Sequence, residues 1–102
     1  MTAYHTSAIV HPGAVIPEGV EIGPFCVIGS DVVLGEGVKL HNGVTLQGRT
    51  TIGEGCEIFQ GAVIGTQPQI LGFEDGLESR IEIGPRTVLR EHVTVHPGSP
   101  EL

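Results

Sequence analysis

The sequence has no tryptophan and few basic, sulfur-containing or aromatic residues. It contains one Tyr, three Phe, one Met and two Cys, and five Lys plus Arg stand against twelve Asp plus Glu, for a net charge of −7. So acidic a chain is not expected to bind nucleic acid or an anionic membrane surface. It has no long apolar run, and its start lacks the basic and hydrophobic stretches of a signal peptide. We therefore expect no membrane insertion and a cytoplasmic location.

Glycine is abundant, and aliphatic residues recur at a fixed spacing. Every sixth residue from Val10 to Ile64 is Val, Ile or Leu, and the residue two positions earlier is Ala, Val, Cys or Thr in every repeat. A six-residue period fits neither an α-helix nor a hairpin sheet and is typical of a parallel β-helix built from hexapeptides. Side chains two residues apart share one face of a strand, so both positions are expected to point inward.

The spacing of three glutamates indicates that three hexapeptides make one coil. Glu18, Glu36 and Glu54 recur at every third hexapeptide in P-E-G or G-E-G contexts, so we expect them to stack along one corner. Glycines near the corners suit the positive φ that sharp turns often need. On this count residues 1–102 form a single β-helix domain of a little over four coils.

The period breaks after Ile64 and resumes near Ile81. The step from Ile64 to Ile83 is longer than three hexapeptides where one is expected, so a segment of about two hexapeptides leaves the coil. We expect residues from about 67 to 80 to form one extended loop. Loops on repeat scaffolds often carry function, since the wall of a solenoid offers few concavities.

The cysteines and histidines predict neither a disulfide nor a metal site. Cys26 and Cys56 lie five hexapeptides apart at inward positions, on different faces and coils of a three-hexapeptide winding, so we expect two buried thiols. Zn²⁺ needs three protein ligands, and only His92 and His96 stand at a ligand-like spacing. No metal and no cofactor are expected. His41 follows an inward aliphatic residue and is expected to be a solvated wall position.

Three segments carry a resemblance to a known family: HPGAVIPEGVEIGPFCVIG, GAVIGTQPQ and RIEIGPRTVLREHVTVHPGS. Their most specific parts are I-G-P-F-C, I-G-x-x-P-Q, and R-E-x-V-T beginning at Arg90. They resemble the N-terminal half of the bacterial acyl-carrier-protein–UDP-N-acetylglucosamine O-acyltransferases of lipid A biosynthesis, which belong to the hexapeptide-repeat acyltransferase superfamily. The resemblance implies a left-handed parallel β-helix assembled as a homotrimer, with active sites in clefts between subunits.

The resemblance also implies a reaction and substrate contacts. The family transfers a 3-hydroxyacyl chain from acyl carrier protein to the sugar 3-hydroxyl of UDP-N-acetylglucosamine. Gln69 matches the family's loop glutamine, a substrate contact, and His96 is expected to line the cleft as a second substrate-binding residue rather than to act as a base. Ile70 stands where the family has Asp, and Pro97 where it has Arg.

No catalytic residue is assigned. The family's general-base histidine lies in a stretch resembling H-x-A-H-D, which this sequence does not contain. We therefore expect the chain by itself to be inactive.

Two other interpretations remain open. The chain can also be read as a non-catalytic trimeric β-helix, a structural or binding module that stands alone or was engineered. A third interpretation is a small acetyltransferase that uses coenzyme A. Apolar residues between the inward positions favour side-by-side association of coils under each interpretation; they are Val15, Val27, Val33 and Val63.

Overall fold

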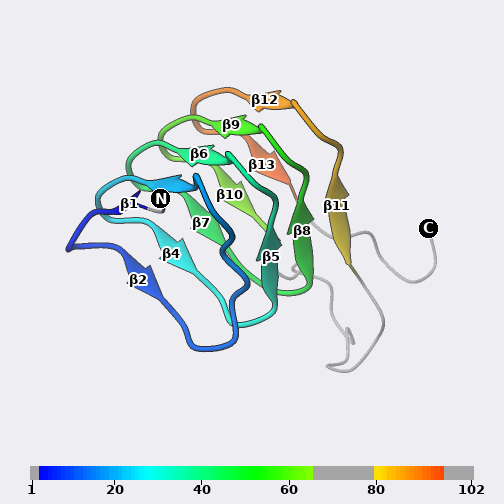
Figure 1. Cartoon of the computed structure of the whole chain (residues 1–102). Coiled ribbons are helices and arrows are strands. Elements are labelled where there is room, and N and C mark those ends of the chain that lie inside the picture. The colour runs from blue at the N-terminus through cyan, green and yellow to red at the C-terminus, as the bar shows by residue number, and fades with distance from the viewer. Residues whose placement is uncertain (1–2, 66–79, 96–102) are drawn as a thin grey trace, which may run out of the picture.

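The computed structural model describes residues 3–65 and 80–95, which form short strands joined by tight turns (Figure 1). These residues contain thirteen strands of two or three residues each and no helix. All strand pairs among them are parallel and belong to three sheets. The predicted all-β class with parallel strands is confirmed.

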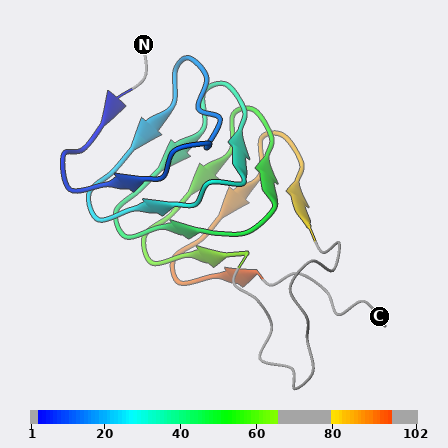
Figure 2. The same cartoon turned by 90° about the horizontal axis from the view of Figure 1, so that it is seen from below.

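Consecutive strands of the chain belong to different sheets. The first sheet contains β1 (Ala3–Tyr4), β3 (Glu21–Ile22), β6 (Lys39–Leu40), β9 (Glu57–Ile58) and β12 (Val88–Leu89). The second contains β2 (Ile9–Val10), β4 (Val27–Ile28), β7 (Thr45–Leu46), β10 (Val63–Ile64) and β13 (Thr94–Val95). The third contains β5 (Val32–Leu34), β8 (Thr50–Ile52) and β11 (Ile81–Ile83). The chain thus visits the sheets in turn, which makes a parallel β-helix (Figure 2).

The pairing register repeats at every third hexapeptide up to β10. Glu21 pairs with Lys39, and Lys39 pairs with Glu57. Across the interruption the partners lie farther apart in the chain, as in the pair of Ile58 with Leu89. The other two sheets show the same longer offset at this point, so the coil after the interruption stacks in register with the coil before it.

The core is a continuous file of inward side chains along the tube. The aliphatic position of each repeat and the small position before it point inward together, because they share one face of each strand. Both positions are buried throughout the middle of the helix: Val20, Ile22, Cys26, Ile28, Val32, Leu34, Val38, Leu40, Val44, Leu46, Thr50, Ile52, Cys56, Ile58, Ala62 and Ile64. The positions that repeat in the sequence are therefore the positions that form the core.

Tight corners separate the sheets. Glycines with positive φ occupy many of them, and Phe25, Arg86 and His92 adopt positive φ without being glycine. The predicted glutamate corner is confirmed, because the N–H of Gly37 donates to the Glu18 carbonyl oxygen and the N–H of Gly55 to that of Glu36. These bonds connect one coil to the next along a single edge.

The outward apolar positions are only partly covered. Val15 and Val33 are 52% and 39% exposed, whereas Val27 and Val63 are half-buried. The prediction that these valines face outward is confirmed. Among the residues described, no helix has the length and apolar character needed to cross a membrane.

Candidate functional site

The two residues predicted to bind substrate lie outside the described residues. Gln69 belongs to the predicted loop, of which only Arg80 is described, and His96 follows the last described residue. Ile70 and Pro97, the departures from the family pattern, also lie outside. Their roles stay predictions.

The chain leaves and re-enters the coil at neighbouring points. Gly65, which directly follows β10, is buried, and a Cβ at this position would collide with the carbonyl oxygen of Gln47. The N–H of Ile81, at the start of β11, donates to the Arg49 carbonyl oxygen at 2.9 Å. Both ends of the interruption therefore contact one corner of the preceding coil, residues 47–49.

A column of planar side chains crosses three coils on the outer wall. We call His41, Phe59 and Arg90 the planar column. The ring centroids of His41 and Phe59 lie 4.4 Å apart with an interplanar angle of 11°, and the Arg90 guanidinium carbon lies 4.2 Å from the Phe59 centroid. Phe59 thus contacts a histidine on one side and a guanidinium on the other, and a cation over a ring contributes about 0.5–1 kcal/mol at exposed sites.

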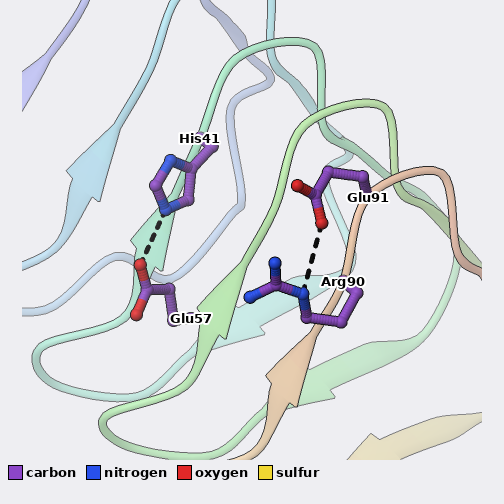
Figure 3. A network of polar contacts seen from close by, with 4 residues as sticks. All are labelled: His41, Glu57, Arg90 and Glu91. Carbon is purple, nitrogen blue, oxygen red and sulfur yellow. Dashed lines mark hydrogen bonds and ion pairs between the residues drawn. The ribbon is translucent and has the colours of Figure 1, made fainter.

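Two carboxylates fix the ends of the planar column (Figure 3). Nε2 of His41 lies 2.7 Å from Oε2 of Glu57, and Nε of Arg90 lies 3.2 Å from Oε1 of Glu91. The His41 and Glu57 side chains are about one-third exposed. His41 thus lies on the wall and is partly exposed, as expected, but its ring is also stacked on one face and hydrogen-bonded at one nitrogen.

Sequence reasoning treated these residues separately, although a signal for the column exists. His41 and Phe59 stand at the same offset as the paired residues Leu40 and Ile58, three hexapeptides apart. Phe59 and Arg90 stand at the longer offset of the pair across the interruption. Glu57 comes two positions before Phe59, which places it diagonally across from His41 on the adjacent coil. Writing the sequence one coil per line, with the interruption set aside, aligns His41, Phe59 and Arg90 and places Glu57 two positions to the side.

The site shows no metal-binding geometry. Within residues 3–65 and 80–95, no three His, Cys, Asp or Glu side chains gather in a group that could hold a metal ion. Chemically, the planar column presents two stacked rings and a guanidinium that is paired with Glu91.

Both cysteines are free and buried, as predicted. The Cys26 thiol donates to the carbonyl oxygen of His41 at 2.9 Å, and the Cys56 thiol donates to that of Gly84 at 3.0 Å. Burial raises the pKa of the Cys26 thiol, while backbone hydrogen bonds around Val44, Gly23 and Gly43 oppose the shift. Each thiol therefore ties its turn to the next coil.

The raised pKa of Cys26 predicts a loss of stability at alkaline pH. The folded state holds this proton more tightly than the unfolded chain, so the stabilisation is complete below the ordinary pKa of 9.0 and is lost as pH rises through the folded pKa. Ionisation of Cys26 steepens the fall of the free energy of unfolding with pH by at most about 1.4 kcal/mol per pH unit. Urea unfolding between pH 7 and 10 should show a steeper decline in the wild type than in Cys26→Ala. Parallel curves would contradict the assignment, because all other titrating groups are common to both proteins.

A comparison with known protein families identifies the family of the chain. The family model described as the GMPPB C-terminal domain matches residues 4–99, well over half of the chain. The chain belongs to this family.

Among curated proteins, the relatives of this family member carry one recurrent name. The present chain is 61% identical over 97 residues to the acyl-[acyl-carrier-protein]–UDP-N-acetylglucosamine O-acyltransferase of Anaeromyxobacter sp. (strain Fw109-5). This match covers 95% of this chain and 37% of that protein. It is 50% identical over 52 residues to the protein of the same name from Caulobacter vibrioides, covering 51% of this chain and 19% of the relative.

Solved structures agree with the sequence relatives. LpxA from Acinetobacter baumannii superposes with a TM-score of 0.89 at 44% identity, covering 96% of this chain and 38% of that chain. The UDP-N-acetylglucosamine acyltransferase of Francisella novicida gives a TM-score of 0.89 at 40% identity, covering 96% and 36%. The resemblance stated from the sequence is thus confirmed: the chain matches an N-terminal part of these proteins, and it spans less than two-fifths of their length.

Proposed function

We propose that these residues form the N-terminal β-helical part of a cytoplasmic UDP-N-acetylglucosamine 3-O-acyltransferase of lipid A biosynthesis. The acyl donor is a 3-hydroxyacyl chain on acyl carrier protein, and the acceptor is the sugar hydroxyl. The observation that carries the proposal is the 61% identity to the Anaeromyxobacter acyltransferase over 95% of this chain. The match to the GMPPB C-terminal domain over residues 4–99 does not name this reaction.

The proposal includes the finer features of the fold. The helix is left-handed, has a little over four coils in a single domain over residues 1–102, and carries one extended loop over about 67–80. Three copies assemble with clefts between neighbours, where Gln69 and His96 contact the sugar nucleotide. The chain provides scaffold and substrate contacts, and it is inactive alone because H-x-A-H-D is not among its residues.

A chimera tests the proposal with this chain's residues in a complete enzyme. The aligned segment of the Anaeromyxobacter protein is replaced by the present sequence, and acyl transfer from 3-hydroxyacyl carrier protein to UDP-N-acetylglucosamine is measured. We expect an active trimer, no transfer by the present chain alone, and a kcat/KM lowered about tenfold by Gln69→Ala, the effect of one lost hydrogen bond to substrate.

Gln60→Ala provides the matched control, because Gln60 is an exposed glutamine on the described wall. It should leave kcat/KM unchanged. A folded, trimeric chimera that transfers no acyl group would contradict the proposed function and would favour the non-catalytic module.

A further inference from the structure

The planar column continues past His41 to a position that has no side chain. The N–H groups of His5, Gly23 and His41 each donate to a carbonyl oxygen of the following coil at 2.9 Å, so the three residues occupy the same place on successive coils. Gly23 supplies no side chain at this place, which lies between His5 and His41 in the described part of the chain. We call it the vacant position.

A side chain at residue 23 cannot fill the vacant position. A Cβ at Gly23 would lie 2.9 Å from the His41 carbonyl carbon and 3.1 Å from the Asn42 nitrogen, too close to backbone that no side-chain rotation can move. The glycine is required by the close approach of two coils. An empty space on the wall is the consequence.

The vacant position has the height of one stacked ring. Parallel strands lie about 4.8 Å apart, so residues two coils apart are separated by about 9.6 Å. His41 and Phe59 show that planar rings stack here at one-coil spacing, with centroids 4.4 Å apart. A flat ring at the level of Gly23 would stack on His41 at a similar distance and face His5 on its other side.

An open groove of about 640 Å³ surrounds the vacant position, and His5, Gly23, Phe25, Lys39 and His41 are among its lining residues. Phe25 is 72% exposed and stands at a corner with φ +61°. Its N–H donates to Oγ of Ser7, which in turn hydrogen-bonds Nδ1 of His5 at 2.8 Å. The His5 ring and the Phe25 corner are thus held by one serine.

The charges beside the groove select against anions. Lys39 stands in register between Glu21 and Glu57 on adjacent strands. Glu21 and Lys39 both line the groove, and the Glu57 carboxylate is hydrogen-bonded to His41 in its wall, so two carboxylates stand against one ammonium here in a chain of net charge −7. A neutral or cationic ring is favoured over an anionic one.

We propose that this groove binds a planar aromatic small molecule without negative charge, whose ring occupies the vacant position and stacks on His41. The inference stands on the groove alone and is independent of the proposed transferase function.

Three probes that share the indole ring system test the proposal: neutral indole, cationic tryptamine and anionic indole-3-acetate. Binding to the whole chain is followed by the NMR amide shifts of Gly23 and His41. We expect saturable shifts, with tryptamine about 2- to 5-fold tighter than indole and indole-3-acetate the weakest, as for exposed charge pairs. Tyr4, the single tyrosine of a chain without tryptophan, lines the groove, and its emission should fall by energy transfer to the bound indole.

Two variants localise the ring. His41→Ala should weaken indole binding about 5-fold, the effect of one lost aromatic stack, and Phe25→Ala, which removes an exposed wall of the groove without threatening the fold, should also weaken it. His11→Ala is the matched control, because His11 is exposed, also follows an inward aliphatic residue and does not line the groove.

Equal affinity in His41→Ala and His11→Ala would overturn the proposal. So would shifts that do not saturate, tighter binding of the anionic probe, or indole binding that weakens as protein concentration rises, since the last result would mean that a second copy covers the groove.

Discussion

Replacing Gly35 by Ala is expected to lower the free energy of unfolding by about 3 kcal/mol, at the upper end of the cost of overpacking. A Cβ at this position would lie 2.5 Å from the Glu54 backbone nitrogen and 2.8 Å from the Gly53 carbonyl carbon of the next coil. Backbone cannot rotate out of the way, so the two coils must separate and lose hydrogen bonds such as that from Gly35 N–H to Ile52 O, 2.7 Å long. Urea unfolding followed by far-UV circular dichroism measures the loss.

Gly84→Ala is the control at the same place on another coil. The N–H of Gly53 donates to the Ile83 carbonyl oxygen, which aligns Gly84 with Gly35 and Gly53. Within the described part of the chain, nothing lies within 4 Å of a Cβ at Gly84, and its φ is not positive. Its replacement should change stability by no more than about 0.5 kcal/mol. If Gly35→Ala and Gly84→Ala lowered the free energy of unfolding equally, the backbone preference of glycine, and not contact between coils, would explain these glycines.

Replacing Ile28 by Ala should cost about 2–5 kcal/mol, the usual range for truncating a buried isoleucine. Its side chain is fully buried in β4, between the inward residues Val10 and Leu46 of the paired strands. Inward side chains from three sheets fill the tube and form its whole core, so truncation of one leaves its neighbours without contacts. Urea unfolding again provides the measurement.

Ile9→Ala tests the same chemistry on the opposite face of the same sheet. Ile9, in β2, is 55% exposed, so its truncation should change stability by about 0.5 kcal/mol or less. A loss from Ile9→Ala as large as that from Ile28→Ala would show that the outward face is covered, for instance by another copy of the chain.

The inward positions could be predicted from the sequence because they depend only on local geometry. A strand alternates its side chains, so the period of six placed Ile28 and Cys26 in the core before any contact was known. The recurrence of Glu18, Glu36 and Glu54 at every third hexapeptide likewise located one corner.

The reason for several glycines was only partly predicted. Positive φ was expected at the corners, and Gly37 and Gly43 have it. Gly23, Gly35 and Gly53, which directly follow inward aliphatic residues, do not; they are glycine because the next coil's backbone lies against them. That contact joins residues about one coil apart, and a pattern of residue types does not report it.

The planar column likewise depends on contacts between coils. His41 was expected to be a solvated wall position, and only the stacking of coils brings its ring against Phe59 with Glu57 at the edge. Their one-coil offset in the sequence indicates which residues align, but the side-chain contacts between them form only when the coils stack.

The sequence alone determined the repeat, the inward face and the family resemblance, because a six-residue period leaves one way to bury the aliphatic residues. Tertiary structure decided what the outer wall does. Coil stacking brings residues that are a whole coil apart in the chain to within a single strand spacing, whether or not the interruption lies between them. It thereby creates the column of His41, Phe59 and Arg90 and the vacant position at Gly23.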